Sequence, residues 1–195
     1  LMAIVAEGHR QRVYLAPTNK HRAVADVSAP VDLPSGDIPD KALGFRVREY
    51  GMTCFTDLFT NRQLMALMTF SGLVTEARDR ALVDAQTAGM ASGERLDAGG
   101  TDAAAYADAV ATYLGLAISR TLNKSTSVCS WDSSPKMEAV RGLFARQAIP
   151  MAWDFAEANV LGHTSGKFAE DNEWFARSNE QLHATGPHGD TMQDD

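Results

Sequence analysis

The sequence predicts a mainly α protein: an irregular helical bundle with a small N-terminal β-hairpin. Apolar residues recur at helical spacing over long stretches after residue 60, and helix-start signals precede these stretches. Strand-like runs are confined to the first fifty residues. The 195 residues are 45% hydrophobic and 22% charged, which is ordinary for a chain that builds a core without disulfides. Area scaling for the 21.1 kDa chain predicts about 9,000 Å² of accessible surface after folding.

The first predicted region, residues 1–59, opens with the hairpin. Two β-prone runs, at residues 2–5 and 13–15, flank a turn that contains Gly8. A short helix is expected over residues 21–27.

Proline interrupts the rest of this region. Pro30, Pro34 and Pro39 predict a loop over residues 28–40, because proline breaks helices and central strands. The run Phe45–Tyr50 then alternates apolar and charged residues, which is typical of a half-exposed strand.

The second predicted region, residues 60–183, is the helical bundle. Its first helix begins with a capping box, in which the side chains of Thr60 and Gln63 each accept from the other residue's backbone N–H. The helix is expected to end near Ala88, before Gly89. Five consecutive apolar residues predict burial on all sides in its first half, whereas charged residues predict that its second half meets water.

A second helix is expected over residues 102–122. Thr101 or Asp102 can cap its N-terminus. Its apolar spacing places Tyr106 and Tyr113 in the core.

The third helix is expected over residues 135–159. Pro135 occupies its first turn, a later proline kinks it, and Phe144 lies on its inner face. A fourth helix is expected over residues 168–183, followed by a flexible tail at 184–195.

The formal net charge of −7 is unevenly distributed. Residues 1–62 carry +1, residues 63–124 carry −2 and residues 125–195 carry −6. A protein that binds DNA through its phosphates needs a basic face, and this chain as a whole is acidic. The acidic C-terminal part is expected to be a solvated face.

Motifs for a self-contained active site are missing from the sequence. Cys54 and Cys129 form no CxxC motif or disulfide framework, and the five histidines show no metal-ligand spacing. No phosphate-binding glycine loop and no bilayer-spanning apolar run is present. We therefore expect a cytoplasmic location with no membrane partner. Because the chain starts at Leu1 within an apolar run, we expect a piece of a longer protein.

Four runs carry a family resemblance. They are Tyr50–Leu64 (YGMTCFTDLFTNRQL), Tyr106–Leu114, Cys129–Asp132 and Val140–Glu157. Together they resemble the bacterial adenine-specific DNA methylases that contain a zinc ribbon, a family often associated with phage defence. The part from Phe144 onward is the most specific. One departure is a valine where the family pattern leads us to expect proline, after Asn159.

The resemblance implies that this chain is an interior segment of such an enzyme. In the family, a glycine motif that binds S-adenosylmethionine and a zinc ribbon come before this segment, and an Asp-Pro-Pro-Tyr motif that contacts the target adenine follows it. Neither the glycine motif nor Asp-Pro-Pro-Tyr occurs in this sequence. The resemblance therefore implies a DNA methyltransferase as the parent, with S-adenosylmethionine and zinc held elsewhere. It assigns no catalytic, cofactor-binding or metal-binding residue to this chain.

Two roles remain open for the segment: DNA engagement or scaffolding within the parent chain, and a helical protein–protein interaction module without nucleic-acid contact. Methylation of an adenine in a duplex requires the base to be flipped out, and the enzyme to hold the distorted DNA by phosphate contacts and stacking. The candidate DNA contacts are Arg62, Lys124, Trp131, Arg141 and Arg146. The competing interpretation pairs Arg141 and Arg146 with Glu138, Asp154 or Glu157, and places Trp131 and Trp153 in the core.

Overall fold

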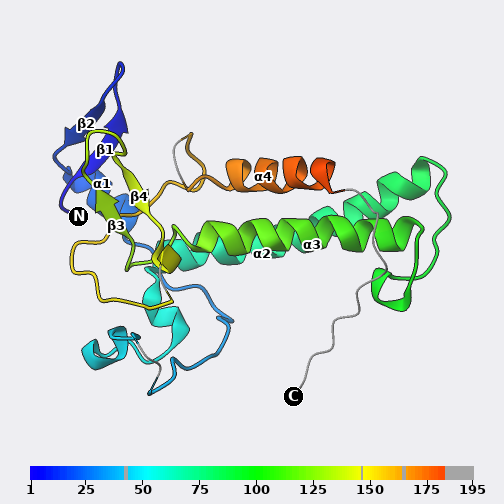
Figure 1. Ribbon diagram of the computed structural model, residues 1–195, viewed down its shortest axis with the longest axis horizontal. Coiled ribbons are helices and arrows are strands. Elements are labelled where there is room, and N and C mark those ends of the chain that lie inside the picture. Colours follow the sequence, from blue (N-terminus) through cyan, green and yellow to red (C-terminus); the bar gives the residue numbers. More distant parts are fainter. Residues whose placement is uncertain (42–43, 146, 164–165, 183–195) are drawn as a thin grey trace.

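The computed structural model describes residues 1–41, 44–145, 147–163 and 166–182. The molecule is elongated and mainly helical (Figure 1). One end, here called the base, holds two β-hairpins and a hydrophobic cluster. From the base extends a long arm of three α-helices, and the opposite end of the arm is here called the tip.

The N-terminal hairpin forms as predicted. Strand β1 (Ile4–Glu7) pairs with β2 (Arg12–Leu15) in antiparallel register. The Gly8 N–H donates to the carbonyl of Gln11 at 2.8 Å and closes the turn. The short helix α1 (Asn19–Ala25) follows and begins two residues earlier than expected.

Three α-helices form the arm, namely α2 (Asn61–Thr87), α3 (Ala103–Leu122) and α4 (Phe168–Gln181). The predicted capping box of α2 is confirmed: Thr60 N–H donates to Gln63 Oε1 at 2.8 Å, and Gln63 N–H donates to Thr60 Oγ1 at 3.4 Å. Helix α3 returns beside α2, and the two pack along their length (Figure 1). The predicted tail at 184–195 lies outside the described residues.

Helix α4 is fixed to the arm by one buried carboxylate and one aromatic contact. The carboxylate of Asp171 accepts from Arg120 Nε and from Thr121 Oγ1, both at 2.8 Å. The rings of Phe70 and Phe168 stack with centroids 4.6 Å apart. A buried carboxylate needs such partners, because desolvation without them is costly.

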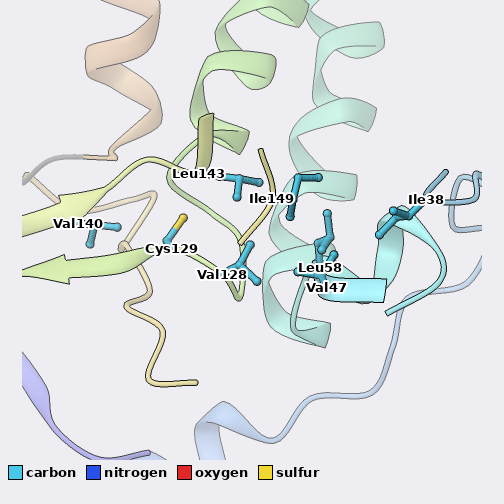
Figure 2. Close-up of a cluster of buried hydrophobic side chains, with 8 residues drawn as sticks. All are labelled: Ile38, Val47, Leu58, Val128, Cys129, Val140, Leu143 and Ile149. Carbon is cyan, nitrogen blue, oxygen red and sulfur yellow. The ribbon is translucent and has the colours of Figure 1, made fainter. Parts of the chain in front are cut away.

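The main hydrophobic cluster lies in the base (Figure 2). It combines residues from both predicted regions. Its members are Ile38, Val47, Leu58, Val128, Cys129, Val140, Leu143 and Ile149. The segment that contains Ile149 joins this cluster beside residues 44–46: Ile149 N–H donates to the Gly44 carbonyl at 3.2 Å, and Arg46 N–H donates to the Ile149 carbonyl at 3.0 Å. Gly44 has a φ of +82°, and a Cβ there would lie 2.9 Å from the Ala148 Cβ.

The prediction of a third helix over 135–159 is wrong. After one turn at Pro135, Glu138 adopts a φ of +38°, which ends any helix. Strand β4 (Ala139–Arg141) then pairs with β3 (Ser130–Asp132), a short 3₁₀ turn follows at Leu143–Ala145, and the rest is irregular. Val140 is buried opposite Trp131, nine residues earlier, so pairing in this hairpin outweighs the helical spacing.

Three smaller expectations are also wrong. Phe45–Tyr50 is not a strand: Phe45 forms one isolated bridge, and a 3₁₀ turn (η1, Val47–Tyr50) follows. Tyr106 and Tyr113 are 51% and 40% exposed, so they lie outside the core. The first half of α2 is buried on one side only, because Met65 is 43% exposed.

The accessible surface is larger than that of a compact domain of the same mass. The accessible area is 14048 Å², whereas a compact chain of this mass would expose about 9,000 Å². Among the residues that the structure describes, fifteen hydrophobic residues are buried, five of them alanines, while twenty-three large hydrophobic side chains are exposed. The chain on its own therefore covers only part of its apolar surface.

Candidate nucleic-acid interface

Arg62 is fully engaged in protein contacts. It lies in the first turn of α2, where its Nε and Nη2 donate to the two carboxylate oxygens of Glu157 at 2.7 and 2.5 Å. Its Nη1 donates to the Ala25 carbonyl at 3.1 Å. The hydrogen bond to Glu157 raises the pKa of the Arg62 guanidinium. Arg62 therefore ties α1, α2 and the Glu157 segment together, which leaves it little capacity for a phosphate.

Arg141 is also paired, with a partner that the sequence did not indicate. Its Nε and Nη2 donate to Asp132 Oδ2 at 3.0 and 2.8 Å, across the β3–β4 hairpin. The Ser134 N–H donates to the other Asp132 oxygen at 2.9 Å. The hydrogen bonds from Ser134, and after them the one from Arg141, lower the pKa of the Asp132 carboxyl to about 2. Arg141 pairs with Asp132 instead of Glu138, Asp154 or Glu157.

The other three predicted contacts differ in their placement. Lys124 follows α3 and is half-buried. Trp131 is half-buried against the base cluster, and its Nε1 donates to the Tyr14 hydroxyl at 3.3 Å. Arg146 lies outside the described residues. The structure thus places Arg62, Trp131 and Arg141 in the base, with both arginines taken up by carboxylates.

Trp153 was expected in the core and is 75% exposed. It contacts Tyr50 edge to face, with ring centroids 5.1 Å apart. Tyr50 itself is 53% exposed. The expectation rested on the general burial preference of aromatic residues, which the irregular segment around Trp153 does not follow.

A second cluster of charges, at the tip, was not predicted. The carboxylate of Asp108 on α3 is buried and accepts from Arg78 Nε at 2.7 Å, from Arg95 Nε and Nη2 at 3.0 and 3.2 Å, and from the Leu96 N–H at 3.1 Å. The hydrogen bonds from Arg95 and Arg78 lower the pKa of Asp108 to about 2. A shallow depression of about 490 Å³, open to solvent, borders this cluster. The cluster closes the loop between α2 and α3, because Asp108 of α3 binds both Arg78 of α2 and Arg95 of the loop.

The described residues offer no candidate metal centre. Within them, no group of three or more histidine, cysteine, aspartate or glutamate side chains comes close enough to hold an ion. Cys129 is buried, and the Cys54 thiol lies 3.5 Å from Asp37 Oδ1. In the same part of the chain, no helix combines the length and apolar character needed to cross a bilayer.

Comparison with known proteins adds no relative. No family model matches the chain, and no curated protein or solved structure is significantly similar to it.

Proposed function

We propose that this chain is an interior segment of a bacterial adenine-specific DNA methyltransferase, in which it serves as a scaffold for the catalytic parts. The proposal rests on the residue runs that resemble the methylase family and on the exposed apolar surface of the structure.

The runs that carry the resemblance supply much of the base. The Tyr50–Leu64 run contains the core residue Leu58 and the start of α2. The Val140–Glu157 run contains Ile149, which is buried in the core, and Glu157, which binds Arg62. Similarity concentrated in core and pairing residues points to a shared architecture, and it assigns no reactive group. Zinc and S-adenosylmethionine belong, in this proposal, to other parts of the parent, because the resemblance places the zinc ribbon and the glycine motif before this segment.

The single observation behind the scaffold role is the uncovered apolar surface. On the arm alone, Met65 and Leu73 of α2, Tyr113 and Leu116 of α3, and Trp174 of α4 are each between 40% and 48% exposed. Tyrosine, tryptophan and methionine in exposed positions are typical of surfaces that another protein element covers. A scaffold that packs against the rest of its own parent would bury them.

The alternative, an interaction module without nucleic-acid contact, is favoured by one specific observation. Arg62 and Arg141, two of the predicted DNA contacts, are held by carboxylates. Methyl transfer to adenine by the full-length product distinguishes the two roles.

The test uses the gene that encodes this segment. Its full-length product should transfer methyl groups to adenine in duplex DNA, whereas the isolated chain should neither do so nor bind S-adenosylmethionine in calorimetry. Tyr113→Asp in the parent should lower methyl transfer at least tenfold and leave the melting temperature of the isolated chain unchanged. The matched control is Ser119→Asp, also exposed on α3, which should change neither. An inactive full-length product, or methyl transfer by the isolated chain, would refute the proposal.

A further inference from the structure

One stretch near the N-terminus carries cations without any acidic residue. The eighteen residues Gly8–Ala25 contain four cations and no acidic residue, so they carry +4 within a chain of −7. The remainder therefore carries −11. The cations are Arg10, Arg12, Lys20 and Arg22.

This segment is here called the basic end. It comprises the turn of the first hairpin, strand β2 and helix α1. Arg12 and Tyr14 are two residues apart on β2 and so share one face of the hairpin. Arg10 lies in the turn with a φ of +59°, and Lys20 and Arg22 are exposed on α1. The hairpin projects from the base, at the opposite end of the molecule from the tip (Figure 1).

The cations of the basic end differ from most arginines elsewhere. Seven arginines outside it form ion pairs with carboxylates, including Arg62 and Arg141. Across the described part of the chain, no carboxylate oxygen lies within ion-pair distance of the four cations of the basic end. Three acidic residues border the segment: Asp26 follows α1 as its C-cap, Glu7 is opposite Arg12 in the hairpin register, and Glu138 accepts from the Tyr14 hydroxyl at 3.1 Å.

The hairpin that carries these charges is anchored to the base. The Tyr14 hydroxyl accepts from Trp131 Nε1 at 3.3 Å, and the two rings meet edge to face at 6.4 Å. Tyr14 is nevertheless 51% exposed beside the basic residues. The hairpin, with its cations and the partly exposed Tyr14 ring, is therefore held in place by the base. This anchoring reduces the entropy lost when a ligand binds.

We propose that the basic end binds the phosphate backbone of duplex DNA. Unpaired cations at a projecting end attract a polyanion, while the acidic remainder of the chain repels it and so restricts contact to this end. The choice of DNA as the polyanion rests on the proposed function. The contact is independent of base sequence, because phosphates carry no sequence information directly.

Fluorescence anisotropy of labelled duplex DNA, titrated with the isolated chain between 50 and 200 mM salt, tests the proposal. If all four cations meet phosphates, log K should fall with log salt at a slope of about −3.6, a loss of roughly 100-fold over this range. The double variant Arg10→Ala/Arg12→Ala should reduce the slope by about 2. The control Arg80→Ala/Arg177→Ala removes the same charge from the arm and should leave the slope unchanged. Circular dichroism confirms folding of each variant.

Three outcomes would overturn the inference. They are no binding at 50 mM salt, an unchanged slope in the Arg10/Arg12 variant, and tighter binding of polyglutamate than of DNA at equal salt. The last would identify an acidic protein as the partner. The proposed function is tested separately, because it depends on methyl transfer by the full-length product. If that product methylates DNA but the basic end does not bind DNA, only this inference is refuted.

Discussion

Replacing Ile149 by alanine tests the path of the chain through the base. Ile149 is 2% exposed, and its backbone groups bond to Gly44 and Arg46. A helix over 135–159 would instead place Phe144 on the buried face, whereas the structure leaves Phe144 61% exposed. The structure therefore buries Ile149 and exposes Phe144, whereas the predicted helix buries Phe144.

The magnitude follows from what the substitution deletes. Isoleucine to alanine removes three buried carbons, which contribute about 0.8 kcal/mol each, or about 2.4 kcal/mol together. The cluster around Ile149 draws on several chain segments that cannot all collapse into the space, so a cavity remains and adds to the loss. The expected loss in the free energy of unfolding is about 3–4 kcal/mol.

Urea denaturation at 25 °C, followed by circular dichroism, measures this loss. Ile149→Val should cost about 0.5–1.5 kcal/mol, and Phe144→Ala should stay within about 0.5 kcal/mol of the parent chain. A loss below about 1 kcal/mol for Ile149→Ala, or a larger loss for Phe144→Ala than for Ile149→Ala, would show that the segment does not follow the path described.

Three further predictions concern local features. Gly44→Ala should destabilise the chain more than Gly51→Ala in the same denaturation assay, because both glycines have positive φ but only a Cβ at Gly44 would meet neighbouring atoms within 4 Å. A double-mutant cycle on Arg62 and Glu157 should give a coupling of about 1 kcal/mol, since the pair is bidentate and about two-thirds buried; zero coupling would contradict the pairing. The lowered pKa of Asp108, about 2, means that its contribution to stability is complete above its ordinary value near 3.8 and is lost as the pH falls toward 2. Asp108→Asn should therefore flatten the pH dependence of the melting temperature in that window, and an unchanged profile would contradict it.

Features encoded by neighbouring residues were predicted well. The capping box of α2 needs only Thr60 and Gln63, which are three residues apart, and the observed helix begins where they place it. The N-terminal hairpin is similarly local, since its turn joins two adjacent β-prone runs. In both cases the groups that satisfy the backbone lie within a few residues of one another.

The failed predictions depend on partners far along the chain. The backbone N–H groups of Leu143 and Phe144 donate to Asn123, the first to its carbonyl at 2.7 Å and the second to its Oδ1 at 2.8 Å. The helical spacing of apolar residues after Pro135 contains no information about these partners, and the tertiary contacts decide the structure.

In the candidate interface, too, pairings between distant residues could not be predicted, whereas a local charge pattern could be. Arg62 and Glu157 are 95 residues apart, so the sequence could not reveal that the arginine is occupied. The basic end, in contrast, is visible in the sequence as a run without acids. It was missed because the charge was summed over residues 1–62, where seven acidic residues mask it.

The alanine-rich packing of the arm has a mechanical consequence. Four of the buried residues of α3 are alanines, and near the tip Asp108 braces α3 against Arg78 of α2. Short side chains have no alternative rotamers to absorb a displacement. The 27 residues of α2 extend over about 40 Å. We therefore expect α2 and α3 to move together as a rigid pair when the tip loop is displaced.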